Sequence, residues 1–181
     1  MPVQFNVSQL LQDPFGATRS YDLTEDAIDL DDSVARDVRG HVKFTHTNFG
    51  IMAQVEADAE MDLTCARCLE QFQGGEHVAF TEEYRPTIDI LTGQPSAADA
   101  HSETVFEISE NHIVDLTEAL RQHFLLAMEL IPICREDCGG LCPTCGVNLN
   151  NETCQCPPPE VTNPFAVLQG LLGETDRSET R

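Results

Sequence analysis

The stretch Gly50-Ile-Met-Ala-Gln-Val-Glu-Ala57, followed by Glu60-Met-Asp-Leu-Thr-Cys65, decides the fold of this chain. Hydrophobic and polar residues alternate along it, which is the pattern of strands that bury one face. The alternation extends from Gly40 to Arg85. We therefore expect tight turns at residues 48–50 and at Asp58-Ala59, and strands over His41–Thr47, Gly50–Ala57, Glu60–Cys65 and His77–Tyr84.

The residues on either side of this region follow other patterns. Residues 1–40 mix short hydrophobic patches with an acidic run, Asp22 to Asp32, that holds six acids, and we expect this segment to drape over the sheet. Residues 86–103 combine prolines with small and acidic residues, which predicts a flexible loop. Short strands are expected at residues 104–108 and 113–116.

One amphipathic helix is predicted over Asp115–Ile131. Hydrophobic residues recur there at helical spacing, so this stripe must be buried against the sheet. Glu118 follows Asp115 by three residues, as in a capping box, and Pro132 ends the helix. His123 lies on the stripe, and we expect it to be a hydrogen-bonded core residue rather than a ligand.

These elements predict an α+β fold, in which a mainly antiparallel β-sheet is packed by one amphipathic helix. A cysteine-rich zinc-binding extension and a short C-terminal helix, capped by Asn163, are expected to follow. The predicted domains are a core at residues 1–133 that includes the Cys65/Cys68 hairpin, a cysteine-rich zinc segment at residues 134–160, and a terminal helix with a disordered tail at residues 161–181.

The chain has eight cysteines, and their spacing predicts metal sites. Cys142-Pro-Thr-Cys145-Gly146 has the form of a zinc knuckle, in which Gly146 lets the chain reverse and successive amides can point at the second sulfur. Clustered thiols in a cytosolic protein stay reduced and indicate metal before disulfides. One or two zinc ions are expected, and the candidate ligands are Cys65, Cys68, Cys134, Cys138, Cys142, Cys145, Cys154 and Cys156.

The spacing leaves two ways to divide these ligands. In the first, the most local set is Cys142, Cys145, Cys154 and Cys156, and Cys134 and Cys138 join Cys65 and Cys68. In the second, Cys138, Cys142 and Cys145 share an ion with one of Cys154 and Cys156. Either set of four sulfurs leaves no position for a catalytic water, and the sequence has none of the common catalytic motifs, so we expect no enzyme.

The charge of the chain restricts its partners. Acids outnumber bases 31 to 10, the formal net charge is -21, and Lys43 is the only lysine. Proteins that grip a phosphate backbone need clustered lysine and arginine, and a patch of Arg36, Arg39 and Lys43 is thin. An acidic surface favours basic protein partners, although acids can also serve only for solubility. The chain has no apolar run long enough for a membrane span and no secretory signal pattern, which predicts a cytoplasmic protein.

Three segments, taken in this order, resemble the YceD family, the large ribosomal RNA subunit accumulation proteins, in a variant with a C-terminal cysteine-rich segment. They are Cys65-Ala-Arg-Cys68-Leu-Glu-Gln-Phe72, Cys138-Gly-Gly-Leu-Cys-Pro-Thr-Cys-Gly-Val-Asn-Leu-Asn150 and Asn163-Pro-Phe-Ala-Val-Leu168. The resemblance covers the chain from about residue 20 to 170. It implies a non-enzymatic cytoplasmic factor of ribosome biogenesis that supports normal levels of large-subunit ribosomal RNA.

The resemblance and the charge together predict a partner class. We expect the protein to bind a basic large-subunit ribosomal protein or a pre-large-subunit particle, with any contact to ribosomal RNA indirect. The alternative is a thiol-based redox or zinc-release switch. A redox dithiol needs its first thiolate at a helix N-terminus, and the sequence around Cys65 is strand-like instead.

Overall fold

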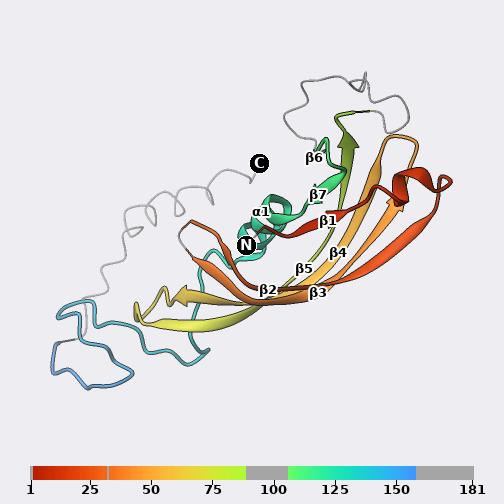
Figure 1. Ribbon diagram of the computed structural model, residues 1–181. Helices are drawn as coiled ribbons and strands as arrows, with labels where there is room; N and C mark the ends of the chain where they lie inside the picture. The colour runs from red at the N-terminus through yellow and green to blue at the C-terminus, as the bar shows by residue number, and fades with distance from the viewer. Residues whose placement is uncertain (1, 32, 89–105, 158–181) are drawn as a thin grey trace, which may run out of the picture. The chain divides into compact units, whose positions relative to one another are not determined.

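The computed structural model describes residues 2–31, 33–88 and 106–157, and the chain divides into two compact units, Met1–Cys138 and Gly139–Arg181. The described part of the first unit is a curved sheet with one α-helix on its concave side (Figure 1). Its elements, in chain order, are β1 (Gln4–Asn6), the short 3-10 helix η1 (Leu10–Gln12), β2 (Thr18–Asp29), β3 (Val34–His46), β4 (Ile51–Thr64), β5 (Gln71–Pro86), β6 (Phe106–Ile108), β7 (Ile113–Asp115) and α1 (Thr117–Ala127).

The sheet has the strand order β1-β7-β6-β5-β4-β3-β2. Every neighbouring pair is antiparallel except β5 and β6, which are parallel. The sheet is therefore mainly antiparallel, as expected, but it is mixed rather than purely antiparallel because of this one pair. In the parallel pair, Tyr84 lies opposite Phe106 and Pro86 opposite Ile108, so β6 runs in the same direction as the end of β5.

Strand β4 is one continuous element, so the expected turn at Asp58-Ala59 is wrong. The alternation persists through this point, with Ala57, Ala59 and Met61 all buried on the concave face. Asp58 lies on the opposite face, where its Oδ1 is 2.8 Å from Nδ1 of His77 on β5. Asp and Ala have low strand propensity, but the β4–β5 ladder holds both in the extended conformation.

The first forty residues do not drape over the sheet as a whole. Thr18–Asp29 is strand β2, which pairs along its length with β3 and buries Leu23 and Ile28. The acids of this stretch lie largely at exposed positions of the strand, which is why they do not prevent it from forming. The residues before β2 supply the edge strand β1 and the short helix η1, and the Phe5 ring of β1 lies 5.4 Å from that of Phe44.

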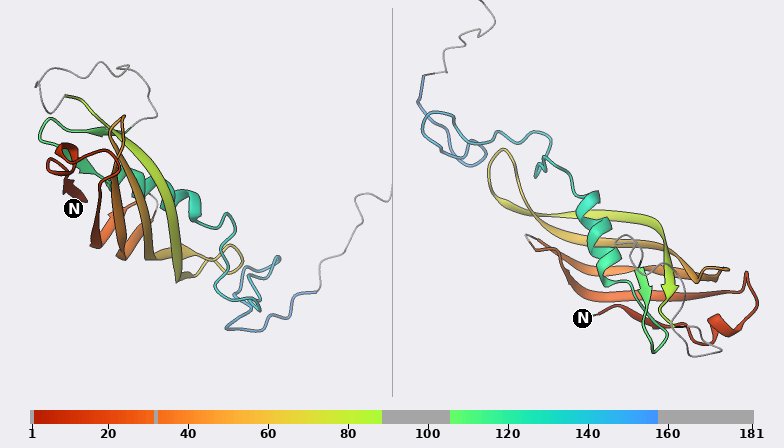
Figure 2. Two further views of the ribbon diagram at one scale, coloured as in Figure 1. Left: turned by 90° about the vertical axis from the view of Figure 1, so that its right-hand side faces the viewer. Right: turned by 90° about the horizontal axis from the view of Figure 1, so that it is seen from above.

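Helix α1 packs its hydrophobic stripe against the concave face, as predicted (Figure 2). Its buried residues are Ala119, Leu120 and Phe124. The His123 ring stacks on Phe80 at 3.9 Å, and its Nε2 is 2.9 Å from a carboxylate oxygen of Glu82. This histidine is therefore hydrogen-bonded as expected, but it is half-buried at the edge of the core rather than within it.

Both ends of α1 differ from the prediction. Asp115 belongs to β7, and although its carboxylate accepts the N–H of Thr117, Glu118 bonds Arg121 and Gln122 instead of closing a capping box. The helix ends at Ala127, before Ile131. Leu130 and Ile131, which lie beyond this end, are exposed. The C-terminal helix and tail, and nearly all of the 86–103 loop, lie outside the described residues. No helix in the described part of the chain could span a membrane.

Leu120 and Leu126 form a matched pair for testing this packing. The Leu120 side chain is fully buried, whereas that of Leu126 is 81% exposed. Leu120→Ala should lower the free energy of unfolding by about 2–5 kcal/mol, because it leaves a cavity between α1 and the sheet. Leu126→Ala should change it by less than about 0.5 kcal/mol. Urea unfolding followed by circular dichroism gives both values, and equal losses would contradict this arrangement of α1.

Candidate metal centres

The cysteines gather in two groups of four, one in each unit. In the first unit the sulfurs of Cys65, Cys68, Cys134 and Cys138 all lie within 4.8 Å of one another, and those of Cys142, Cys145, Cys154 and Cys156 do the same in the second. We call these the first and second clusters. This grouping corresponds to the first of the two divisions that the spacing left open.

Strands β4 and β5 bring together the first half of the first cluster. The N–H of Cys65 donates to the carbonyl of Glu70 at 2.9 Å, and the N–H of Leu69 donates to the carbonyl of Cys65 at 2.9 Å. Leu69 takes a left-handed conformation, with φ of 60°, which closes the turn. Cys65 and Cys68 therefore lie together at the end of the hairpin, as predicted.

The segment after α1 supplies the second half. The N–H of Ala66 donates to the carbonyl of Pro132 at 2.8 Å, which places the residues after Pro132 beside the hairpin end. Arg67 fixes them further, because its Nη1 donates to the carbonyls of Glu136 at 3.3 Å and Cys138 at 3.2 Å. Arg67, which lies between Cys65 and Cys68, thus holds the backbone around Cys138.

The sulfur spacing matches a tetrahedral metal site. Four sulfurs at about 2.3 Å from one ion stand about 3.8 Å apart, along the edges of a tetrahedron. In the first cluster the Cys65–Cys138 and Cys68–Cys134 sulfur pairs are each separated by 3.8 Å. In the second, the Cys142 and Cys154 sulfurs are 3.5 Å apart. A disulfide bond would need about 2.05 Å, so these are free thiols in a metal-ligating arrangement.

The second cluster is built on the knuckle Cys142–Gly146. The N–H of Gly146 donates to the carbonyl of Cys142 at 2.9 Å, and Gly146 has φ of 74°, so the glycine reverses the chain as expected. The N–H of Cys142 in turn donates to the carbonyl of Val147 at 2.8 Å. Cys154 and Cys156 complete the cluster from the extended segment that follows.

Two asparagines support this loop, and the sequence reasoning missed them. Oδ1 of Asn150 accepts the N–H of Gly139 at 2.8 Å, and Oδ1 of Asn148 accepts the N–H of Asn150 at 2.9 Å. Such bonds from asparagine to nearby backbone are typical of tight loops. The pair Asn148-Leu-Asn150 could have indicated them. Arg67 was also missed, and its position between Cys65 and Cys68 was the only available signal.

Electrostatics within each cluster favours a bound cation. The backbone N–H of Cys134 lowers the pKa of Cys65 to about 6, and the N–H groups of Cys145 and Thr144 lower that of Cys142 to about 6. Two amides of the knuckle therefore point at its first sulfur. Burial raises the pKa of Cys134 to about 12, with the neighbouring thiols adding to it. Thiols this close cannot all ionise unless a positive ion compensates their charge.

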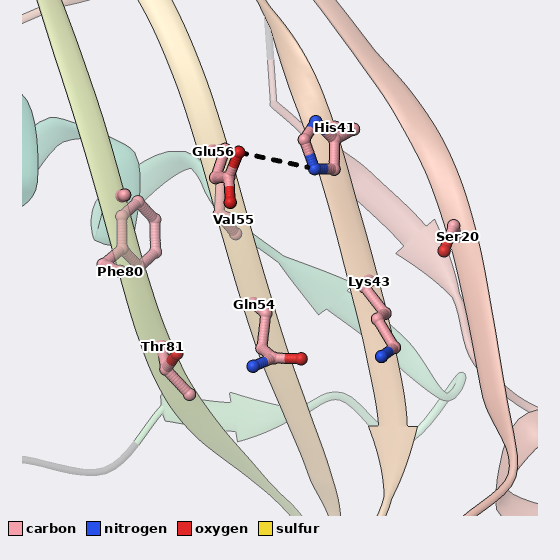
Figure 3. Close-up of a pocket in the computed structure, with 9 residues that line it drawn as sticks. Ser20, His41, Lys43, Gln54, Val55, Glu56, Phe80 and Thr81 are labelled. Carbon is pink, nitrogen blue, oxygen red and sulfur yellow. Dashed lines mark ion pairs between the residues drawn. The ribbon is translucent and has the colours of Figure 1, made fainter.

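The open face of the sheet, opposite α1, is the other place where polar side chains gather (Figure 3). A shallow hollow of about 460 Å³ there is lined by residues that include Ser20, His41, Lys43 and Glu56. His41 lies 3.7 Å from Glu56, and on the same strand Arg36 pairs with Asp62 at 2.9 Å. Within the basic patch on β3, Arg36 is therefore paired with an acid of β4, whereas Arg39 lies 3.8 Å from Asp37 on β3 itself.

Arg67→Met tests the link between the halves of the first cluster. In metal-loaded protein this substitution should make the ion of the first cluster leave for a chelator about tenfold faster, because it removes two charge-assisted hydrogen bonds. The rate at which the second cluster releases its ion should not change. Arg36→Met, which breaks an ion pair elsewhere in the same unit, is the matched control. Chelator-indicator absorbance gives the rates, and an equal effect of both variants would reject this role for Arg67.

Comparison with curated proteins gives matches to mycobacterial relatives, two of which are described here. An uncharacterized protein of Mycobacterium bovis and one of Mycobacterium tuberculosis are each 39% identical to this chain over 92 residues. The alignment covers 49% of this chain but only 40% of each relative, so the chain spans well under half of their length. No solved structure matches the chain.

The sequence profile of one protein family also matches. It carries the description "Large ribosomal RNA subunit accumulation protein YceD" and aligns with residues 53–172. This range includes strand β5, helix α1 and all eight cysteines of both clusters. The chain therefore belongs to the YceD family of large ribosomal RNA subunit accumulation proteins.

Proposed function

We propose that this protein is a non-enzymatic, cytoplasmic factor of large-subunit biogenesis that binds a basic ribosomal protein or an assembling large subunit. The family match over residues 53–172 carries the proposal, because the family is described by the accumulation of large-subunit ribosomal RNA. The partner class follows from the net charge of -21. Contact with ribosomal RNA is indirect in this proposal.

Two features of the described residues support a binding role over catalysis. No acidic, basic or histidine side chain in this part of the chain is buried, so none of these side chains is held in a water-excluded site where its reactivity would change. The clusters each offer four sulfurs to an ion, which leaves no open position for a catalytic water.

The ions are zinc in this proposal. Cysteine thiolates in sets of four, at the sulfur separations of these clusters, suit zinc, and the ion would fix loops that have little core of their own. In the second cluster, Cys142 is the only buried ligand, so its loop has few hydrophobic contacts to hold it without metal. The first cluster also packs against Phe72 and Ile133, which ties it to the sheet.

Native mass spectrometry of the full chain tests the zinc assignment. Reduced protein purified from cells should carry two zinc ions, one for each cluster. Cys65→Ser and Cys142→Ser should each lose one ion, and the double variant should lose both, so each single variant is the control for the other. A metal-free wild-type chain that still unfolds cooperatively would contradict the assignment, because four-sulfur sites supply folding free energy.

Affinity capture from lysate at low salt tests the partner class. The tagged protein should retain large-subunit ribosomal proteins after nuclease treatment, because charge complementarity to protein does not depend on RNA. A tagged unrelated protein of similar net charge is the control for nonspecific capture. Loss of all large-subunit components with nuclease would instead indicate direct RNA contact.

A thiol-based switch is the second candidate function, and one observation favours it. Cys145 is exposed, whereas Cys65, Cys68 and Cys138 are buried. Hydrogen peroxide could oxidise the Cys145 thiolate to a sulfenic acid, with hydroxide as the leaving group. A neighbouring thiolate would then displace a second hydroxide to form a disulfide, and the loss of these two ligands would release the ion. If the protein is such a switch, oxidant should release the ion of the second cluster first and change the amount of partner that the protein captures. Capture that is insensitive to oxidant would leave only the assembly role.

A further inference from the structure

Strand β2 forms one edge of the sheet, and its outer side has no backbone partner among the described residues. β2 is last in the strand order and pairs with β3 alone. The backbone hydrogen bonds outside the regular ladders include none from Thr18–Asp29. The strand is twelve residues long, whereas β1 at the opposite edge has three. A long unpaired edge is a template for another strand.

The ladder shows which groups of β2 are unpaired. The N–H of His46 donates to the carbonyl of Ala17 at 2.9 Å, so these two residues form a hydrogen-bonded pair. The register is constant from there, and such pairs recur at every second residue, at Arg19, Tyr21 and Leu23. The alternate residues therefore direct their N–H and C=O groups away from β3. They are Thr18, Ser20, Asp22 and Thr24, and all four are exposed.

The charge of β2 determines what can pair with this edge. The strand has four acids, Asp22, Glu25, Asp26 and Asp29. Its one base, Arg19, is already engaged, because its guanidinium bonds Asp13 at 3.0 Å and Gln9 at 2.8 Å. A second copy of β2 would bring like charges opposite one another, which is unfavourable. A strand with lysine and arginine would instead bring opposite charges together.

We propose that the outer edge of β2 is a docking site for an extended, basic segment of a partner protein, which joins the sheet as an additional strand. Main-chain hydrogen bonds to Ser20, Asp22 and Thr24 hold the segment, and the acids of β2 select its charge. This inference rests on the proposed function, in which the partner is a basic protein, and it specifies where and in what conformation that partner is bound.

The test uses the full-length protein and a synthetic peptide of about ten residues in which lysine alternates with threonine and valine, a length that matches a strand. Amide hydrogen exchange is measured by NMR. Saturating peptide should slow the exchange of the Ser20, Asp22 and Thr24 amides by about tenfold or more, while those of Arg19, Tyr21 and Leu23 are protected already. The same peptide N-methylated at consecutive central residues keeps its charge but loses donors, and should bind about tenfold more weakly.

Two matched double variants separate strand addition from general charge attraction. Asp22→Lys with Asp26→Lys should weaken peptide binding by about tenfold, because the reversed charges lie on the docking edge. Glu107→Lys with Glu110→Lys changes the net charge equally, at exposed positions on and after β6, and should weaken it by less than about twofold.

Several results would overturn the proposal. They are peptide binding without protection of the β2 amides, equal loss in both double variants, or no binding at all. Protection that grows with protein concentration in the absence of peptide would identify a second copy as the occupant instead. In lysate capture, a β2 variant that still retains large-subunit proteins would reject the edge but keep the proposed function. A wild-type protein that captures none would reject the proposed function, whatever the peptide result.

Discussion

The pairing of β4 with β5 is the constraint on which the rest of the first unit depends. It runs without a break from Ile51 opposite Tyr84 to Thr64 opposite Gln71. One face of this hairpin supplies the surface that α1 covers, and its closed end holds Cys65 and Cys68. Because side chains alternate along a strand, a slip of one residue would turn the core residues to solvent and displace the cysteines. Core and metal ligands are thus fixed by the same register.

Local pattern predicted the elements that bury one face, and it failed where tertiary pairing overrides propensity. The alternation around Val55 and the stripe on α1 identified the helix and the strand structure of β4, although β4 was predicted as two strands. Asp58-Ala59 has the composition of a turn, yet the ladder with β5 keeps it extended. In β2 the many acids obscured the strand, because only Leu23 and Ile28 are buried. These two residues are an odd number of positions apart, so they do not follow the simple alternation of a strand.

The candidate site was predictable in its ligands but not in their grouping. Spacing alone identifies Cys65 with Cys68 and Cys142 with Cys145 as pairs. What joins Cys134 and Cys138 to the hairpin is a backbone bond from Ala66 to the carbonyl of Pro132, together with the reach of Arg67. Neither contact leaves a periodic trace in the sequence, since both link residues that are distant along the chain. Contacts of this kind become visible only once the helix between them has been placed on the sheet.

The first cluster also joins points that are far apart along the chain. Cys68 and Cys134 are separated by 66 positions, and β5, β6, β7 and α1 all lie between them. An ion bound there would tie the two ends of this segment together and so close a loop of chain that contains β5, β6, β7 and α1. By analogy with a disulfide, such a closure removes conformational freedom from the unfolded chain and is worth about 4 kcal/mol for a loop of this size. For as long as the ion stays bound, it would also limit how far apart the two ends of this region can diffuse when the rest of the unit opens.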